Sequence, residues 1–394
     1  MITLDHLHHN FTDWNLAHQR VFLRADLNVP LHNGTIMNDY RLQALLPTLA
    51  VLTQRGAKII LATHIGRPQE HDQQFSTRHL IPWFQAHGYQ VEFQEDLEQA
   101  YQASKQDTPT IVLLENVRFF AGEKTSDHTF AQNLARLADY YVNDAFAVVH
   151  RNDTSVTLVP NLFPPERRSI GLLIQQELTM LNQLLNSVRK PFVLILGGGK
   201  AADKLPLLQR FLTIADTIIL CPALVFTFLK ALGKPVGASL VDTAHIQLCK
   251  QIYEQAQQHG VQLVFPLDYQ VAHATFNGPL SYVDAEQFPK DGVGISIGPK
   301  TQQLIAPLIA QAGTIFCNGL MGSIGRPESL QGADMVYSAM ATSPAFTVIG
   351  GGDSVAVAQR GGYDKNISYI STGGGATLAY LAGQELPGLK AFVD

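Results

Sequence analysis

Cationic and amide side chains follow four short apolar segments in the first half of the chain. These segments, each typical of a buried strand, are 21–23, 58–63, 110–114 and 140–142. The polar residues that follow them, with Arg41 at the start of the first amphipathic stretch, are Asp26, Asn28, Arg41, His64, Arg67, Arg118 and Arg151. Guanidinium groups bind carboxylate or phosphate oxygens through paired N–H donors, and histidine adds a donor. The set predicts a pocket for a small, multiply charged anion.

Two other interpretations of these residues stay open. Any one arginine could be a solvated surface side chain, as most arginines are. A metal site at His64 and His150 is the weaker alternative, because the nearby carboxylates lack the compact spacing of a metal-ligand set.

Three glycine triplets in the second half predict a site for a polyphosphate. The triplets 197–199, 350–352 and 373–375 follow apolar segments at 192–196, 346–349 and 367–370. Glycine lets backbone N–H groups approach a phosphate, and a helix that starts there adds its dipole. Lys200 and Lys204 have the spacing of one helical turn, so both would face one polyphosphate. Neither P-loop nor GxGxxG spacing is present, so any single loop could be a tight packing turn.

Asp353, directly after the second triplet, is either a helix N-cap or, beside phosphates, a ligand of Mg²⁺. One half of the chain thus suits a small anion and the other a polyphosphate. Phosphoryl transfer needs this combination, since its catalysis is mostly positioning and charge stabilisation.

The elements that position these residues follow from hydrophobic periodicity. Apolar segments alternate with helical patterns such as 39–55, where leucines recur every three or four residues. Further strands are expected at 217–221, 262–266 and 314–317, and further helices at 128–138, 204–213, 301–311 and 175–187. This alternation predicts βαβ units and parallel sheets, whose ligands bind at the carboxyl ends of the strands.

Composition narrows the class of protein. The 394 residues, 46% hydrophobic and 15% charged, are enough for two or three folded domains. A net charge of −5 argues against a nucleic-acid or anionic-membrane partner. The apolar stretch 217–229 is too short for a membrane helix. Three scattered cysteines and a first segment without signal-peptide features favour a reducing, cytoplasmic location.

Ten segments, in this order, resemble the motifs of the phosphoglycerate kinase family. They are RADLNVP, LATHIGRP, LLENVRF, VNDAFAVVHR, LGGGKAADK, IGPKT, NGLMG, IGGGDS, STGGGAT and ELPG. The resemblance extends from about Val21 to Phe392 and includes the spacing of the segments. It is far more specific than any single glycine loop.

The resemblance implies an α/β fold of two Rossmann-like, three-layer αβα lobes with parallel sheets, joined by a helix and a hinge. The implied domains are an N-terminal phosphoglycerate-binding domain (1–174), an interdomain helix (175–190), a C-terminal nucleotide-binding domain (191–380) and a tail (381–394) that returns to the N-terminal domain. It further implies a glycolytic, cytoplasmic monomer without nucleic-acid or membrane partners.

The resemblance also implies roles for individual residues. 3-Phosphoglycerate or 1,3-bisphosphoglycerate would be bound by Asp26, Asn28, Arg41, His64, Arg67, Arg118 and Arg151. Mg-ADP or Mg-ATP would be bound by Gly198, Lys200, Lys204, Asn318, Gly325, Gly351, Gly352, Asp353 and Ser354, with Asp353 on the Mg²⁺ ion. The catalytic groups would be Arg41, Lys200, Lys204 and Gly374.

Departures from the family lie mainly on the nucleotide side. Gly325 stands where a glutamate for the ribose is usual, and Cys221-Pro222-Ala223 replaces a glycine-rich turn near the adenine. These departures leave one alternative, a catalytically impaired relative that acts as a phosphoglycerate-binding or regulatory protein. Another, a dinucleotide-dependent oxidoreductase, is disfavoured by the missing GxGxxG motif.

Overall fold

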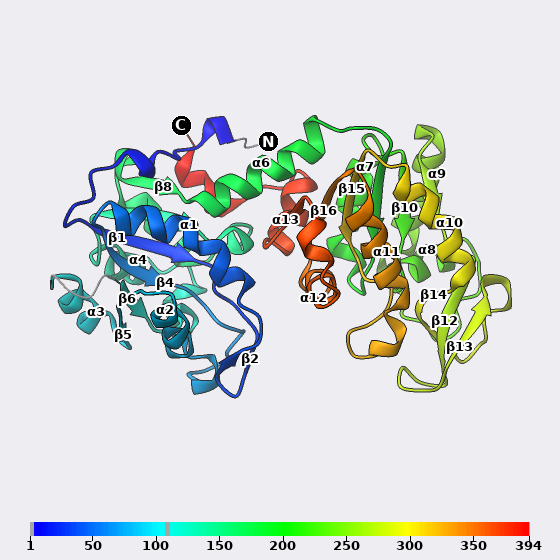
Figure 1. Ribbon diagram of the computed structural model, residues 1–394, viewed down its shortest axis with the longest axis horizontal. Coiled ribbons are helices and arrows are strands. Elements are labelled where there is room, and N and C mark those ends of the chain that lie inside the picture. Colours follow the sequence, from blue (N-terminus) through cyan, green and yellow to red (C-terminus); the bar gives the residue numbers. More distant parts are fainter. Residues whose placement is uncertain (1–3, 107–110, 394) are drawn as a thin grey trace. The chain divides into compact units, whose positions relative to one another are not determined.

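Two six-stranded parallel sheets organise the chain, one in each of two units. The computed structural model describes residues 4–106 and 111–393 (Figure 1). The first unit comprises Met1–Thr179 and Glu385–Asp394, and the second comprises Met180–Gln384. The predicted fold class, α/β with parallel sheets in two lobes, is confirmed.

The first sheet has the order β5-β6-β4-β1-β7-β8, and all its strand pairs are parallel. Its strands are β1 (Arg20–Ala25), β4 (Lys58–Ala62), β5 (Val91–Gln94), β6 (Ile111–Leu114), β7 (Tyr140–Asp144) and β8 (Arg168–Ile170). The helices of this part are α1 (Tyr40–Gln54), α2 (Ile81–Ala86), α3 (Leu97–Ser104), α4 (His128–Ala135), α5 (Thr154–Thr157) and α6 (Leu172–Asn186). Two 3₁₀ turns matter for the site, η5 (Val117–Phe119) after β6 and η7 (Phe146–Val148) after β7. A short antiparallel pair, β2 (Leu31–His32) and β3 (Thr35–Ile36), precedes α1.

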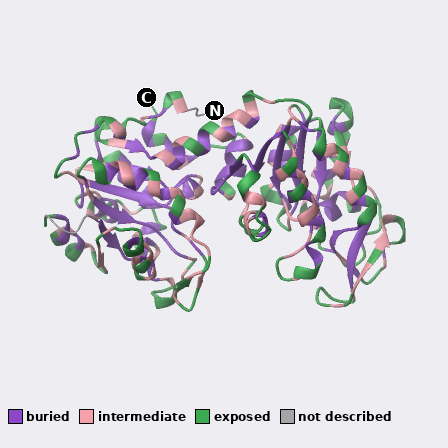
Figure 2. Cartoon of the chain, viewed as in Figure 1, coloured by how far each residue is buried: buried purple, intermediate pink, exposed green. Residues whose placement is uncertain are grey.

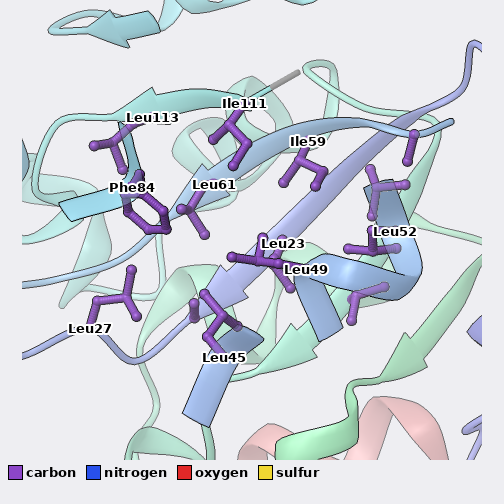
Figure 3. Packing of buried hydrophobic residues seen from close by; sticks show 14 of the residues in the cluster. Leu23, Leu27, Leu45, Leu49, Leu52, Ile59, Leu61, Phe84, Ile111 and Leu113 are labelled. Carbon is purple, nitrogen blue, oxygen red and sulfur yellow. The ribbon is translucent and has the colours of Figure 1, made fainter. Parts of the chain in front are cut away.

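Leucines at helical spacing bury one face of α1 against this sheet. Leu45, Leu49 and Leu52 are at most 1% exposed and pack with Leu23 and Ile59 (Figure 3). Burying each such side chain is worth about 1.5–3 kcal/mol. β1 and β4 are buried along almost their whole length (Figure 2), as expected where helices cover a parallel sheet. The sheet therefore holds the residues at its carboxyl edge in fixed positions.

The C-terminal segment η15 (Pro387–Phe392) packs in the first unit, although it follows the second unit in the chain (Figure 1). The Asn143 side chain donates to the Gly388 carbonyl, and the Gly388 N–H donates to the Val149 carbonyl. The His8 N–H donates to the Phe392 carbonyl at 2.7 Å. These bonds attach the chain end to β7 and to the N-terminal segment.

The second sheet has the order β11-β10-β9-β15-β16-β17 and is also parallel. Its strands are β9 (Phe192–Leu196), β10 (Thr217–Leu220), β11 (Gln262–Val264), β15 (Thr314–Asn318), β16 (Phe346–Ile349) and β17 (Tyr369–Ile370). Its helices are α7 (Leu205–Phe211), α8 (Leu224–Ala231), α9 (Ile246–His259), α10 (Pro299–Ala310), α11 (Gln331–Thr342), α12 (Gly352–Arg360) and α13 (Gly375–Leu381).

Several features of the fold were not predicted from the sequence, among them the short pair β2 and β3. A three-stranded antiparallel sheet combines β12 (Asp268–His273), β13 (Leu280–Asp284) and β14 (Gly292–Ile297). The edge strands β5 and β8 were also unpredicted. The expected strand 367–370 shortens to β17, and Thr110 of the expected strand 110–114 lies outside the described residues.

Within the described ranges, no helix is long and apolar enough to cross a membrane.

Candidate functional site

Neighbouring strands of the first sheet deliver the predicted anion-binding residues to one edge. Asp26 follows β1, His64 follows β4, Arg118 lies in η5 after β6, and Arg151 follows η7 after β7. The charges of Arg118, Arg41 and Arg151 all act on the His64 ring. These residues, which are far apart in the sequence, therefore form one electrostatic environment.

Asp26 organises the β1 side of this edge. Its carboxylate is buried and forms an ion pair with Arg41 from the first turn of α1. Its other oxygen lies 4.0 Å from Nδ1 of His64. Asn28 accepts the Gly66 N–H at 2.8 Å, and this bond holds the loop after β4, where Gly66 has a positive φ of 64°. Asp26 and Asn28 thus position groups that can donate to an anion.

Arg118 is the most enclosed of the predicted arginines. Its Nη1 donates to the Gly66 carbonyl at 2.5 Å, and its backbone N–H donates to Asn116. Its side chain is 4% exposed, and Nη2 lies 3.8 Å from the Asp153 carboxylate. Asp153 in turn accepts a 2.6 Å bond from Lys124. Burial and the charge of Arg151 lower the pKa of Arg118 to about 10, so it stays charged at neutral pH.

A buried ion pair that the sequence reasoning missed lies behind these residues. Arg24 of β1 and Glu123 are fully buried, 3.8 Å apart. The Arg24 Nε donates to the Ser155 hydroxyl, which donates to Glu123, both at 2.7 Å. An arginine within the apolar strand sequence VFLRA was the available signal. It was overlooked because only residues after each strand were considered.

Unsatisfied polar atoms are concentrated at this edge. Ten buried side-chain atoms in the described part of the chain have no hydrogen-bond partner. Six of them lie here: Arg24 Nη2, His64 Nδ1, Arg118 Nε and Nη2, His150 Nδ1 and Asp153 Oδ2. Three of these atoms, Arg24 Nη2 and the Nε and Nη2 of Arg118, are guanidinium donors, whereas Asp153 Oδ2 can only accept. An orphaned buried donor costs free energy, so the guanidinium donors indicate a ligand that accepts from them.

The charges at this edge do not cancel. We define the basic cluster as Arg24, Asp26, Arg41, His64, Arg118, Glu123, Lys124, His150, Arg151 and Asp153. Burial lowers the pKa of His150 and, more strongly, that of His64, so both rings are neutral near pH 7. Five cationic side chains then face three carboxyl groups, counted here by formal charge, although burial raises the pKa of one of them, Glu123. The formal excess of two positive charges matches a phosphate dianion.

Arg67 differs from the other predicted residues. It follows Gly66 in the same loop, but it is exposed. Within residues 4–106 and 111–393, Arg67 forms no hydrogen bond or ion pair with the basic cluster.

In the second unit, the first glycine triplet follows β9 closely. A side chain at Gly197 would collide with Cys221, and Gly198 has a φ of 107° that favours glycine. The end of the Lys204 side chain lies beside Gly198. Burial is the main cause that lowers the pKa of Lys204, and the nearby charge of Lys200 adds to it. Both predicted lysines therefore lie at the glycine loop, Lys200 directly after it and Lys204 beside Gly198.

The predicted geometry of these lysines was wrong. They do not lie on one α-helical face, because Ala201–Asp203 forms a 3₁₀ turn and α7 begins only at Leu205. Pro206 favours this later start, since proline fits the first turn of a helix. Lys200 is exposed and Lys204 is partly buried.

The second triplet leads into α12, with Gly351 at the N-cap and a φ of 95°. Asp353 is exposed in the first turn and is not the N-cap, so that alternative was wrong. Ser354 is buried, and its hydroxyl bonds with Tyr337. Asn318, at the end of β15, lies beside Gly351. Anions are favoured at such a helix start by the free N–H groups and the helix dipole.

The remaining predicted residues fall at two places. Gly374 is the N-cap of α13, with a positive φ of 53°. Gly325 lies in an exposed turn closed by a bridge between Ser323 and Arg326. The contacts of the described residues do not join Gly325 to Asn318 or Asp353.

Metal-binding groups are sparse. Among residues 4–106 and 111–393, no group of three or more histidine, cysteine or carboxylate side chains could hold a metal ion. The weaker hypothesis of a metal at His64 and His150 therefore finds no support. A lone exposed carboxylate such as Asp353 fits Mg²⁺ that arrives with nucleotide phosphates, because this ion commonly uses one or two protein carboxylates.

The fold and its charged groups define a two-unit α/β protein with a basic cluster in one unit and glycine loops with lysines in the other. The phosphoglycerate kinase family model matches residues 11–384. The chain is 40% identical over 398 residues to phosphoglycerate kinase from Streptomyces coelicolor, covering 96% of this chain and 97% of that protein. It is 39% identical over 392 residues to the enzyme from Chlamydia trachomatis serovar D, covering 96% of each.

Solved structures agree with this match. Phosphoglycerate kinase from Coxiella burnetii superposes with a TM-score of 0.82 at 32% identity, covering 97% of each chain. The Pyrococcus horikoshii enzyme gives 0.80 at 29% identity, covering 99% of this chain and 98% of that one. This chain belongs to the phosphoglycerate kinase family. The predicted family is confirmed, and membership makes the protein a phosphotransferase whose family substrates are phosphoglycerate and ATP or ADP.

Proposed function

We propose that this protein catalyses the reversible, Mg²⁺-dependent transfer of a phosphoryl group between 1,3-bisphosphoglycerate and ADP, and in reverse between ATP and 3-phosphoglycerate. The reaction would serve glycolysis in the cytoplasm, with the protein acting as a monomer. The observation that carries this proposal is the basic cluster, whose orphaned donors and excess of two positive charges suit a phosphorylated acid.

Phosphoglycerate would bind in the first unit, within the proposed N-terminal domain of residues 1–174, to which the proposed tail 381–394 returns. Arg118 and Arg151 would bind the phosphate, because the free Nε and Nη2 of Arg118 form the fork that suits two phosphate oxygens. Arg67 would complete the phosphate site from the exposed loop. Arg41, His64 and the Asp26–Asn28 segment would bind the reacting end of the substrate.

The nucleotide would bind in the second unit, within the proposed C-terminal domain of residues 191–380, which follows the proposed interdomain helix 175–190 in the chain. Gly198 and the two lysines, Lys200 and Lys204, would contact its phosphates. Asn318 and the start of α12, Gly351 to Ser354, would continue that contact, with Gly325 near the ribose. Asp353 would hold Mg²⁺, which neutralises phosphate charge when it is bound.

This chain's own residues account for the catalysis we propose. The attacking carboxylate of 3-phosphoglycerate is already ionised at neutral pH, so no general base is required. Negative charge on the transferring group would be stabilised by Arg41, the two lysines and the backbone at Gly374. These donors belong to different units, so we propose that the units close around the substrates and exclude water.

A coupled spectrophotometric assay tests this function. ATP, 3-phosphoglycerate and Mg²⁺ are supplied, and 1,3-bisphosphoglycerate is followed through a dehydrogenase and NADH. We expect turnover with ATP, and GTP run in parallel tests the effect of the altered nucleotide side. Folded protein that binds 3-phosphoglycerate but turns over no nucleotide would contradict the proposal and support the impaired-relative alternative.

A further inference from the structure

The carboxylate of Asp153 lies inside the basic cluster, beside Arg118, which has two buried donors without a hydrogen-bond partner. Its Oδ2 lies 3.8 Å from Nη2 of Arg118, and both side chains are 4% exposed. This separation exceeds hydrogen-bond range, and Oδ2, Nη2 and the Arg118 Nε have no hydrogen-bond partner. Asp153 therefore attracts Arg118 without occupying its donors.

The rest of the Asp153 carboxylate is held by Lys124. The Lys124 Nζ donates to Oδ1 at 2.6 Å, from a side chain that is 47% exposed. Asp153 also stands at the N-cap of α5, where an aspartate usually accepts a backbone N–H of the first turn. It makes no such bond here. The carboxylate therefore does not cap α5 but interacts with two cationic side chains, those of Arg118 and Lys124.

We propose that Asp153 sets the affinity of the phosphoglycerate site for the phosphate group. It serves as the counter-ion of Arg118 while no anion is bound. When phosphate binds, the Arg118 guanidinium donates to the phosphate oxygens, and the phosphate replaces Asp153 as its main counter-ion. Lys124 keeps the carboxylate in place throughout. This inference rests on the proposed function, since it takes the phosphate of phosphoglycerate as the ligand.

The charges of the cluster give the sign of each effect. With Asp153 the cluster carries a formal excess of two positive charges, and without it the excess is three. Removal of the carboxylate therefore strengthens phosphate binding and leaves Arg118 without its nearest carboxylate in the free protein. Loss of the Lys124 charge leaves the buried carboxylate less well compensated, and this weakens phosphate binding.

The test measures binding of inorganic phosphate and of 3-phosphoglycerate, separately, by calorimetry on the full-length protein. We expect Asp153→Asn to bind both anions about 3- to 30-fold more tightly, because a like charge leaves the site. Lys124→Met should bind them more weakly by a similar factor, and the double variant should lie close to the wild type. Glu95→Gln, at the exposed Arg78–Glu95 ion pair, is the control for net charge and should change neither affinity.

Opposite signs separate this role from a merely structural one. If folded Asp153→Asn binds phosphate as weakly as Lys124→Met, or with wild-type affinity, the proposal is overturned. If Asp153→Asn does not fold, Lys124→Met decides alone, and unchanged or tighter phosphate binding overturns the proposal. The predicted signs with phosphate but no turnover would sink the proposed function and leave the counter-ion role standing. Turnover by the wild type, without the predicted opposite changes in phosphate affinity, would overturn the counter-ion role and leave the proposed function standing.

Discussion

The Asp144 carboxyl at the end of β7 accepts the Ile174 N–H in the first turn of α6 at 3.1 Å. A side chain 30 residues earlier therefore caps the helix that continues from the first unit into the second. The other carboxyl oxygen, Oδ2, is buried without a hydrogen-bond partner. Burial raises the pKa of Asp144 to about 7, against the opposing effect of its hydrogen bonds.

This pKa predicts how stability depends on pH. Between about pH 4 and 7 the unfolded chain has lost this proton while the folded chain keeps it, so the contribution of Asp144 to stability falls as pH rises. The side chain in Asp144→Asn cannot ionise, so the free energy of unfolding of this variant does not fall with pH for this reason. From pH 5 to pH 8 we expect the variant to gain about 3 kcal/mol relative to the wild type, measured by chemical or thermal unfolding. A stability difference that stays constant with pH would contradict the raised pKa.

Arg41 should act on turnover more than on affinity. It stands in the first turn of α1 and is partly exposed, although it pairs with the buried Asp26. If it stabilises charge on the transferring group, Arg41→Ala lowers kcat by about 100-fold or more, the usual cost of losing such a donor. The dissociation constant of 3-phosphoglycerate should change less than about tenfold. Arg78→Ala, at an exposed surface pair, is the matched control. A pure loss of affinity would count against this role.

Asp353 should affect the Mg²⁺ requirement alone. It is exposed in the first turn of α12, so its replacement costs the fold little. We expect Asp353→Asn to raise the Mg²⁺ concentration needed for half-maximal activity by about tenfold or more, because Mg²⁺ prefers charged oxygen ligands. Binding of 3-phosphoglycerate should not change. Glu254→Gln, an exposed carboxylate on α9, serves as control. An unaltered Mg²⁺ dependence would remove Asp353 from the metal site.

The cysteines should be inert in the folded protein. Cys221, Cys249 and Cys317 are fully buried, and burial raises the pKa of each thiol, to about 12 for Cys249 and Cys317. Reaction with a thiol reagent requires the thiolate, and a thiol with a raised pKa is almost entirely protonated at neutral pH. A thiol reagent should therefore label none of the three in native protein and all three after unfolding. Rapid labelling of Cys221 in native protein, with loss of activity, would contradict this and show that the thiol beside the glycine loop is reactive.

Much of the site could be predicted because parallel sheets bring the carboxyl ends of their strands together. This rule found Asp26, His64 and Arg118 from three separate segments. It could not find Arg24 or Glu123, since their positions depend on a buried network that crosses the unit. Asp153 and Lys124 were missed for the same reason, because an ion pair between distant segments leaves no local spacing.

The second unit shows another limit of local patterns. Helical spacing placed Lys200 and Lys204 on one face, but the chain forms a 3₁₀ turn before α7 begins. The antiparallel sheet of β12 to β14 was missed because its pairing depends on contacts between segments and not on one long apolar segment. The glycine loops were found because each follows a strongly apolar strand.

The most direct test of phosphoryl transfer by this protein follows the phosphoryl group itself. ATP labelled at the γ-phosphate is mixed with 3-phosphoglycerate, Mg²⁺ and the wild-type protein, and the labelled products are separated over time. We expect the label to move to 1,3-bisphosphoglycerate and to return to ATP when unlabelled ADP is added. Label that stays on ATP, or that appears only as free phosphate, would contradict phosphoryl transfer to phosphoglycerate as the function of this protein.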